Sequence, residues 1–353
     1  MKIRLAILDS DSIYAARIAK VFEAKYADVL ELYTFTELEL AKEHLKSSKI
    51  DVFLVSESFD IDPREISPRC GFAYLVESPD VMSVRDQHVV CKFQRVEMFY
   101  KQILNLYSEG SNQVVNQEQG EEITKVIVFS SPCGGVGTSC MAAACAMRYA
   151  AAGARVLYLN LETFGSSETY FQGEGTTDMS DVIYALKSKK SNLTIKLESC
   201  VKNSGEGVEF YSQAKLALDM MELTGEDIIT LVRHLKSMGI YETIVLDMDF
   251  ALDKERLSVY RQANAWVWVS DGSETANGKV LRAYQALSVV EQKDTSGLMM
   301  RLRLIYNQFS SKTGQIMGIQ GMKELGGAPI YVHAVTRQVV EQLANIAMLD
   351  RII

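Results

Sequence analysis

A glycine-rich loop between an apolar run and an alanine-rich segment holds the residues most suited to chemistry. The loop contains Gly134, Gly135 and Gly137, and it follows the β-branched run Val126–Phe129. Glycines let successive backbone N–H groups turn toward one anion, because no Cβ blocks the approach. A helix that begins at Thr138 would add the partial positive charge of its N-terminus at the same place. The loop therefore predicts a phosphate-binding site.

This loop lacks the lysine of a typical P-loop. The pattern G-x-x-x-x-G-K-[ST] would place a lysine at position 138, where this chain has Thr138 followed by Ser139. Ser139 keeps the hydroxyl that binds Mg²⁺, whereas the cation that contacts the β- and γ-phosphates is missing. The only lysine nearby, Lys125, lies back on the preceding strand. We therefore expect a protein that holds a nucleotide better than it hydrolyses one.

The flanking segments predict a crossover of strand, loop, helix and parallel strand. Residues 138–152 are alanine-rich, Gly153 follows as a C-cap, and Arg155–Leu161 reads as a second strand. This is roughly the minimum length that joins two parallel strands. For the loop taken alone, an ordinary glycine turn in an α/β protein is the alternative.

Two later strands end in polar side chains that suit a nucleotide site. The apolar run Tyr241–Leu246 leads into Asp247 and Asp249. A carboxylate at the carboxyl end of a neighbouring parallel strand is where a Walker B aspartate reaches the magnesium shell. The run Leu302–Tyr306 leads into Asn307, whose amide can read a base edge. Each has a plainer alternative as a solvated acid or a turn amide, but their order after a glycine loop favours a nucleotide site.

Residues 123–353 resemble the MinD/ParA family of deviant-Walker ATPases, and in particular its CpaE/TadZ branch, which serves Flp (tight-adherence) pilus assembly. The family loop reads K-G-G-x-G-K-[ST], and the branch commonly has threonine in place of the second lysine, as Gly134–Ser139 does. Leu161–Ser166 and Met179–Leu186 resemble the branch signatures D-L-x-F-G and L-S-D-V-L. The resemblance implies a P-loop NTPase domain with a mainly parallel sheet that binds ATP with Mg²⁺ and forms a homodimer.

The resemblance also implies which residues form the site. Nucleotide contacts fall on Cys133, Gly134, Gly135, Val136, Gly137, Thr138, Ser139, Cys140 and Asn307, and metal contacts on Ser139, Asp247 and Asn160. Glu162 falls where the family positions the attacking water.

Two departures from the family pattern concern charge. The signature lysine, which reaches across a dimer to the partner's phosphates, falls at Cys133, and a thiol is uncharged at neutral pH unless it is activated. The family's D-x-D falls at Asn160 and Glu162, so only one of its two carboxylates is kept. A missing cation at developing charge typically costs about 10³-fold or more in rate. We therefore expect weak or negligible hydrolysis.

Residues 1–107 predict a second doubly wound α/β domain. Strands are expected at Lys2–Leu8, Asp51–Val55, Phe72–Val76 and His88–Val90, with a helix at Ile13–Tyr26. The segment resembles the flavodoxin-like receiver domain of response regulators, with an acidic cluster after the first strand and Lys92 near the last. The acceptor position, five residues after Asp51, is Ser56, so no acyl phosphate can form there. We expect an atypical receiver in which Asp9 and Lys92 are a leftover ion pair.

Residues 108–122 predict a polar linker, because they contain four glutamates and no lysine, arginine or aromatic residue.

The composition of the chain limits its possible partners and its location. The chain carries a formal net charge of −8, which argues against a ParA-like DNA surface because counterion release needs clustered lysines and arginines. Six cysteines without a C-x-x-C motif indicate reduced thiols. With no signal peptide and no apolar run of about 20 residues, we expect a cytoplasmic protein. Arg337–Ile353 predicts an amphipathic last helix that packs in the core rather than anchoring to a membrane.

These features predict an ATP-binding localisation or scaffolding factor for Flp/Tad pilus assembly, found at a cell pole in many members of the branch. Its expected partners are ATP, a second copy of the chain and proteins of the pilus secretion machinery, with no nucleic acid. In this interpretation ATP stabilises a homodimer, with at most weak ATPase activity. The main alternative is an active ATPase switch that cycles between monomer and dimer. A third, a phosphorylation-controlled regulator, is disfavoured by Ser56.

Overall fold

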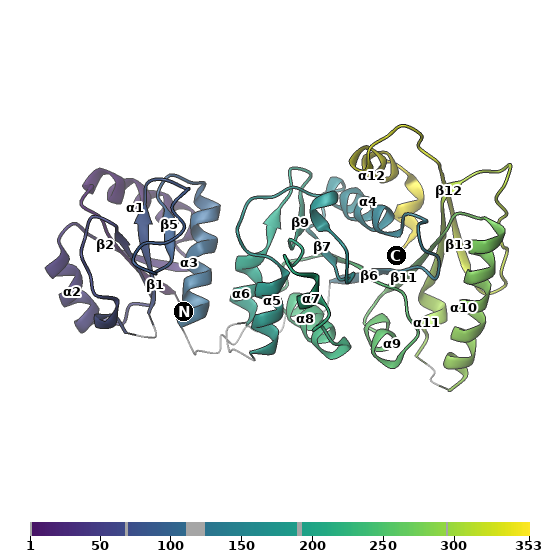
Figure 1. The fold of residues 1–353 in the computed structure, drawn as a ribbon, viewed down its shortest axis with the longest axis horizontal. Helices are drawn as coiled ribbons and strands as arrows, with labels where there is room; N and C mark the ends of the chain where they lie inside the picture. Colours follow the sequence, from purple (N-terminus) through teal and green to yellow (C-terminus); the bar gives the residue numbers. More distant parts are fainter. Residues whose placement is uncertain (1, 68–69, 111–123, 189–192, 294–295) are drawn as a thin grey trace. The chain divides into compact units, whose positions relative to one another are not determined.

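The chain forms two compact units in the computed structural model (Figure 1). The structure describes residues 2–67, 70–110, 124–188, 193–293 and 296–353. The first unit comprises Met1–Asn116 and Lys189–Cys200, and the second comprises Gln117–Ser188 and Val201–Ile353. Of the linker predicted at 108–122, residues 108–110 end a helix and the remainder lies outside the described residues. The domain boundaries at 107 and 123 therefore stay a prediction.

The first unit is built on a five-stranded parallel sheet in the order β2-β1-β3-β4-β5. Its elements are β1 (Ile3–Leu8), α1 (Ser12–Tyr26), β2 (Leu30–Phe35), α2 (Leu38–Ser47), β3 (Val52–Ser56), the 3₁₀ turn η1 (Pro63–Glu65), β4 (Gly71–Val76), β5 (Val89–Cys91) and α3 (Val96–Gly110). Helices α1 and α3 pack against one apolar face of the sheet, and α2 packs against the other. The predicted doubly wound domain is confirmed.

A helix from the middle of the sequence belongs to this first unit. Helix α6 (Leu193–Cys200) packs on α3, where its buried Lys196 donates a hydrogen bond to the Asn105 side chain. Ile195 packs against the same apolar cluster as α1 and α3. Since α6 lies within the range predicted for the second domain, residues 123–353 do not all belong to one compact unit.

The second unit is built on an eight-stranded sheet in the order β13-β12-β11-β6-β10-β7-β9-β8, parallel except for β8. Its strands are β6 (Lys125–Phe129), β7 (Val156–Asn160), β8 (Lys202–Asn203), β9 (Val208–Phe210), β10 (Thr243–Asp247), β11 (Ala265–Ser270), β12 (Leu302–Phe309) and β13 (Lys323–Pro329). Its helices are α4 (Thr138–Ala151), α5 (Met179–Lys187), α7 (Ala217–Met220), α8 (Gly225–Ser237), α9 (Lys254–Tyr260), α10 (Glu274–Lys293), α11 (Leu298–Arg301) and α12 (Thr336–Ala344), with 3₁₀ turns η2 (Ser167–Thr169) and η3 (Ala347–Arg351).

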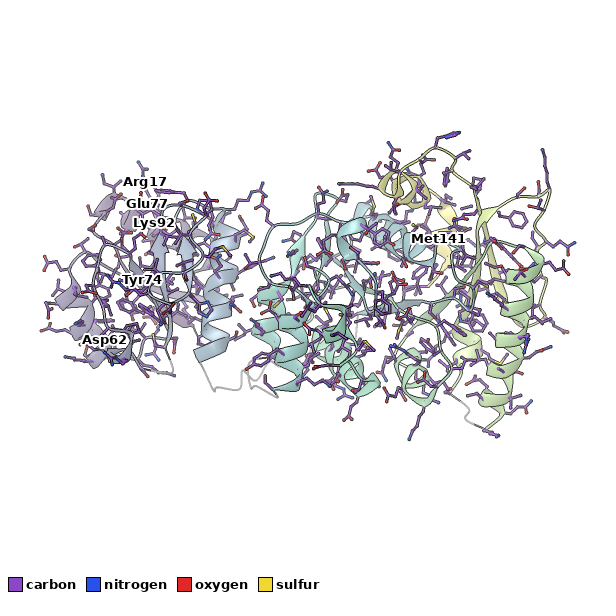
Figure 2. All side chains as sticks on the ribbon, in the orientation of Figure 1. Arg17, Asp62, Tyr74, Glu77, Lys92 and Met141 are labelled. Atoms are coloured by element: carbon purple, nitrogen blue, oxygen red, sulfur yellow. The ribbon has the colours of Figure 1, made fainter. Side chains whose placement is uncertain are left out.

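The central strands of this sheet bring the predicted site residues to one edge. Strand β10 lies between β6 and β7, which matches the buried, apolar, β-branched sequences of these strands. Their carboxyl ends therefore meet beside the N-terminus of α4. The buried face of α4 consists of small residues and of Met141, which is fully buried (Figure 2). Gly153 follows α4 with φ of 94°, as a C-cap glycine does, and the predicted crossover is confirmed.

The predicted single helix at Arg337–Ile353 is wrong. Helix α12 stops at Ala344, Asn345 caps it, and Ile346 is extended with φ of −86° and ψ of 119°. The chain then forms η3, in which Met348 and Leu349 are buried. If the helix continued straight, Met348 and Leu349 would stay on the same face of the helix. The break at Asn345 instead turns these two side chains into the core.

Among the helices of the described ranges, none combines the length and the apolar character that a membrane span requires. All six cysteines are free thiols.

A close approach between β4 and α3 gives a test of the first unit. A Cβ on Gly71 would meet the backbone carbonyl of Leu106, which cannot give way as a flexible side chain could. Gly71→Ala should therefore lower the free energy of unfolding by about 1–3 kcal/mol. The matched control is Gly278→Ala in α10, where nothing lies within 4 Å of the Cβ position. Alanine should stabilise that helix by about 0.5–1 kcal/mol. Denaturant titrations of both variants measure this, and an unchanged midpoint for Gly71→Ala would refute the packing.

Candidate nucleotide-binding site

The glycine loop joins the end of β6 to the start of α4 and needs glycine at one position in particular. Gly137 is the N-cap of α4, with φ of 77° and ψ of 36°, in the left-handed region that favours glycine. A Cβ on Gly137 would lie 2.5 Å from Nδ2 of Asn307. Gly135 also has a positive φ, of 76°. The loop therefore folds tightly because it carries no side chains at these turns.

The backbone of this loop presents free hydrogen-bond donors. Within the described parts of the chain, no group accepts a hydrogen bond from the N–H groups of residues 134–139. Gly134 and Gly135 are exposed, and residues 138 and 139 begin a helix of 14 residues. Free N–H groups at a helix N-terminus attract anions, because the helix dipole adds to their partial charges. This arrangement can bind a phosphate group.

The amide side chain of Asn307, near the end of β12, is hydrogen-bonded to the loop. Asn307 is buried, and its Nδ2 donates a hydrogen bond of 2.8 Å to the carbonyl oxygen of Val136. Gln308 has φ of 55°, and its Nε2 lies 3.5 Å from the Cβ position of Gly137. The predicted base contact of Asn307 stays a prediction, since the structure gives its Nδ2 a bond to the loop. Gln308 carried no sequence signal beyond its place beside Asn307.

A buried carboxylate ends the neighbouring strand β10. The Oδ2 atom of Asp247 accepts a hydrogen bond of 2.8 Å from the Tyr158 hydroxyl and one of 3.3 Å from Nδ2 of Asn160. Its Oδ1 atom is buried and finds no hydrogen-bond partner among the described residues. Burial, and then the charge of Glu162, raises the pKa of the Asp247 carboxyl to about 8. A cation that displaced the proton of this carboxyl would find the unpartnered Oδ1 atom available as a ligand.

The remaining polar residues form a connected group beside Asp247. Ser139 Oγ donates a hydrogen bond of 3.1 Å to Oε2 of Glu162, and Nδ2 of Asn160 lies 3.4 Å from the same oxygen. The Oδ1 atom of Asn160 accepts a hydrogen bond of 3.0 Å from the Glu162 N–H. Asn160 therefore orients Glu162 and Asp247 in this structure, and its predicted contact with a metal stays a prediction.

These residues fit a magnesium ion. Mg²⁺ takes oxygen ligands and is usually held by one or two carboxylates together with substrate phosphates. Ser139 and Asp247 would hold the ion, because the hydroxyl and the unpartnered Oδ1 atom lie at the same edge of the sheet. Glu162 lies within hydrogen-bond reach of Ser139 and adds a second carboxylate.

The two cysteines predicted in the site have neutral thiols. Cys133 is buried, its N–H donates to Ser131 Oγ at 3.0 Å, and its Sγ lies 3.3 Å from the carbonyl oxygen of Ala276 on α10. Burial raises the pKa of the Cys133 thiol. Burial, followed by the charges of nearby carboxylates, also raises the pKa of Cys140. Neither side chain brings a charge to the loop, and the side chain of Cys133 packs on α10.

Two tyrosines near the carboxylates were not predicted from the sequence. Tyr158, on β7, donates to Asp247, and burial raises the pKa of its phenol far above the usual value. Burial is also the main reason why the pKa of Tyr170 is raised. Both phenols therefore stay protonated, and that of Tyr158 acts as a donor. Tyrosines on or near buried strands are common in cores, so nothing in the pattern distinguished these two.

The receiver-type positions of the first unit are occupied by Asp9, Asp11, Ser56 and Lys92. Lys92, which follows β5 (Figure 2), forms an ion pair of 2.6 Å with Asp9, and both side chains are buried. This predicted ion pair is confirmed. Asp11, two residues after Asp9, is the N-cap of α1, because its Oδ1 accepts hydrogen bonds from the N–H groups of residues 13 and 14. Ser56 is buried, and its hydroxyl lies 3.0 Å from that of Ser58.

Comparison with known proteins gives a match for each unit. Residues 1–108 match the family model described as TadZ-like, receiver domain. A ParA family ATPase from Chlorobium tepidum TLS is similar at 20% identity over 65% of this chain and 95% of that chain, with a TM-score of 0.51. The MinC:MinD cell division complex of Aquifex aeolicus is similar at 17% identity over 64% and 93% of the two chains, with a TM-score of 0.48. No curated protein matches the chain.

The comparisons agree with the organisation seen in the structure. At 20% identity, the likeness to the ParA family ATPase shows the fold of the larger unit and leaves its activity open. A TadZ-like receiver domain followed by this fold is the organisation that the CpaE/TadZ resemblance implies. That prediction is confirmed, as is the predicted fold class.

The raised pKa of Asp247 predicts a pH-dependent stability. Between about pH 4 and about pH 8 the folded chain binds one proton more at this carboxyl than the unfolded chain, so the free energy of unfolding falls as the pH rises. The slope from one such group approaches about 1.4 kcal/mol per pH unit. Asp247→Asn should remove this slope, whereas Asp249→Asn, at an exposed site, should keep it. Urea titrations over this pH range measure the effect, and equal slopes in wild type and Asp247→Asn would count against it.

Proposed function

We propose that this chain, whose residues 1–108 belong to the TadZ-like receiver domain family and whose larger unit has the fold of ParA family ATPases, is an ATP-binding scaffold of Tad pilus assembly. Bound ATP with Mg²⁺ stabilises a homodimer, and hydrolysis is weak or absent. The scaffold acts in the cytoplasm and localises the pilus machinery, at a cell pole where the machine is polar.

One observation carries the ATP-binding part of this proposal. The N–H groups of residues 134–139, at the N-terminus of α4, have no acceptor among the described residues, and the Oδ1 atom of Asp247, at the end of the strand next to β6, has no partner either. Phosphates would be held by these backbone donors and by the helix dipole, and the metal by Ser139 and Asp247. The binding energy then comes from the backbone, which the missing lysine does not affect.

The same geometry supports weak turnover. The positions where the family carries lysines hold Cys133, which packs on α10, and Thr138, which begins α4. The ionisable groups near Ser139 include the carboxyl groups of Asp247 and Glu162, and the cation that acts on the thiol of Cys133 is Lys279 on α10. Phosphoryl transfer requires neutralisation of charge on the transferred group, and losing one such cation costs about 10³-fold or more.

A second candidate function, an active ATPase switch, is favoured by the position of Glu162. Its Oε2 atom lies 3.1 Å from the hydroxyl of Ser139, close enough to the metal end of the site to orient a water molecule. We assign Glu162 this role of water positioning. In the scaffold, Glu162 would orient a water molecule, but Cys133 and Thr138 bring no positive charge to the transition state.

Substitution of one glycine tests ATP binding. Gly137→Val should abolish binding, because valine cannot adopt the positive φ of 77° without strain and its Cβ would displace Asn307. Gly205→Val, in an exposed turn with nothing within 4 Å of its Cβ position, is the matched control and should bind as the wild type does. Titration calorimetry with ATP·Mg²⁺ should give a wild-type Kd in the micromolar range or below. Circular dichroism confirms that both variants are folded. No heat of binding in the wild type would refute the nucleotide site.

Restoring the missing charge tests the turnover. Thr138→Lys should tighten ATP binding and raise the hydrolysis rate if Glu162 orients water, and Thr138→Met serves as the uncharged control of similar length. Wild-type turnover should lie far below the typical enzyme range, which begins at about 1 s⁻¹. Release of phosphate under saturating ATP measures it. A wild-type rate of about 1 s⁻¹ or more would favour the switch instead.

A further inference from the structure

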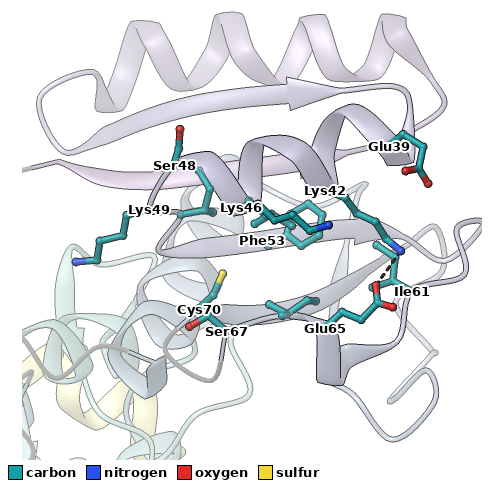
Figure 3. A pocket seen from close by; sticks show the side chains of 13 residues that line it. Glu39, Lys42, Lys46, Ser48, Lys49, Phe53, Ile61, Glu65, Ser67 and Cys70 are labelled. Carbon is teal, nitrogen blue, oxygen red and sulfur yellow. Dashed lines mark ion pairs between the residues drawn. The ribbon is translucent and has the colours of Figure 1, made fainter.

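An exposed lysine of the second unit differs from the lysines that border the groove of the first unit. In that groove of about 800 Å³ next to α2 (Figure 3), Lys42 pairs with Glu65 at 2.8 Å, and Lys49 lies 3.7 Å from Asp51. Lys279, on α10, forms no ion pair and no side-chain hydrogen bond with any described residue. Its charge is therefore available to a ligand.

The stability of α10 does not explain a lysine at this position. Side chains three and four residues apart are neighbours on a helix, and such neighbours of Lys279 include no acid: Thr275, Ala276, Arg282 and Ala283. The helix begins at Glu274, so Lys279 lies toward its N-terminus, where the helix dipole does not stabilise a cation.

Lys279 stands beside the first residue of the glycine loop. The thiol of Cys133 donates a hydrogen bond of 3.3 Å to the carbonyl oxygen of Ala276, three residues before Lys279. Burial raises the pKa of Cys133, and the charge of Lys279 acts in the opposite direction, so the ammonium group lies within electrostatic reach of this thiol. The carboxylate of Asp271 also acts on the thiol, and its Oδ1 accepts a hydrogen bond from the N–H of Ser273.

The same end of the loop exposes its backbone donors. Gly134 and Gly135 follow Cys133 directly and are exposed, and their N–H groups have no acceptor among the described residues. An anion bound to these donors would lie close to the charge of Lys279. A lysine ammonium group is a compact charge on a flexible stem, and it is a common ligand of phosphate in nucleotide-binding loops.

We propose that Lys279 supplies the phosphate-binding cation that the glycine loop lacks at Cys133 and Thr138. Its ammonium group contacts a phosphate oxygen of the nucleotide held by the same chain. Lys279 approaches from the Cys133 end of the loop, whereas Ser139 and Glu162 lie at the other end. A cation that contacts the ground state and the transition state equally raises affinity without raising kcat, so turnover stays weak. This inference rests on the proposed nucleotide site.

ATP titrations of matched variants of the full-length chain test this role. Lys279→Gln should weaken the binding of ATP·Mg²⁺ by about tenfold or more, because a hydrogen bond between charged groups is lost. Lys279→Arg should keep most of the affinity, since it keeps the charge. Lys293→Gln, at an exposed lysine about 20 Å further along α10, is the control and should bind as the wild type does.

Two further measurements separate a phosphate contact from a structural role. The affinity of the wild type should fall more steeply with added salt than that of Lys279→Gln, because salt screens the charge that the variant lacks. Acetylation by a succinimidyl ester, followed by mass spectrometry, should show that ATP·Mg²⁺ protects Lys279 and leaves Lys293 as reactive as before. In the Lys279→Gln background, Thr138→Lys should recover affinity, because it returns a cation to the loop.

The outcomes distinguish this inference from the proposed function. Equal affinity of the wild type and Lys279→Gln, or no protection of Lys279 at saturating ATP, would overturn the inference and leave the nucleotide site in place. No binding of ATP by the wild type would overturn both.

Discussion

The contact between Asn307 and the glycine loop is the interaction on which the candidate site depends. The bond from its Nδ2 to the Val136 carbonyl joins the end of β12 to the loop after β6, although β11 lies between these strands. It is possible only because Gly137 has no side chain. The N–H groups of residues 134–139 in the same loop have no acceptor among the described residues. Loss of this contact would leave the loop without the conformation that makes it a phosphate site.

Much of this arrangement could be predicted from the sequence, because short-range patterns determine it. The apolar runs before Asp247 and Asn307 predicted two strands, each with a polar residue near its carboxyl end. Parallel pairing brings those ends to the same edge of the sheet. The directions of side chains could not be predicted in the same way. Cys133 stands at the family's lysine position, but its thiol lies against the carbonyl of Ala276, a contact made by a helix over 100 residues away in sequence. The unpartnered oxygen of Asp247 also depends on where Tyr158 and Asn160 point.

Two features of the fold differ from what the local sequence pattern predicted, because tertiary packing determines them. Helix α6 has eight residues, and its place on α3 rests on Lys196 reaching Asn105 and on a shared apolar cluster. No pattern within α6 identifies its partner. The continuous amphipathic pattern after Arg337 likewise predicted one helix, but burial of Met348 and Leu349 breaks it at Asn345. Because α6 packs on α3, tests of the nucleotide site are best made on the full-length chain.

The two units share one feature: residues at the positions of a binding site are present, but the residue that the family resemblance expects to carry the chemistry is replaced. In the first unit the Asp9–Lys92 pair is buried at 2.6 Å, while Ser56 stands at the acceptor position. Breaking a buried pair typically costs about 3–5 kcal/mol, so the Asp9–Lys92 pair has a structural role whether or not Ser56 takes part in chemistry. In the second unit the proposed site would hold an anion with backbone N–H groups, while Cys133 and Thr138 stand where the resemblance expects lysines.

The state of the nucleotide on the protein tests the central claim most directly. The full-length chain is loaded with ATP·Mg²⁺, freed of unbound nucleotide, incubated and then extracted with acid, and the extract is separated by chromatography. We predict intact ATP in an amount close to that of the chain, because the loop binds phosphates that it cannot cleave at an appreciable rate. Recovery of ADP alone would show that the chain turns ATP over, and recovery of no nucleotide would show that the glycine loop is not a phosphate site.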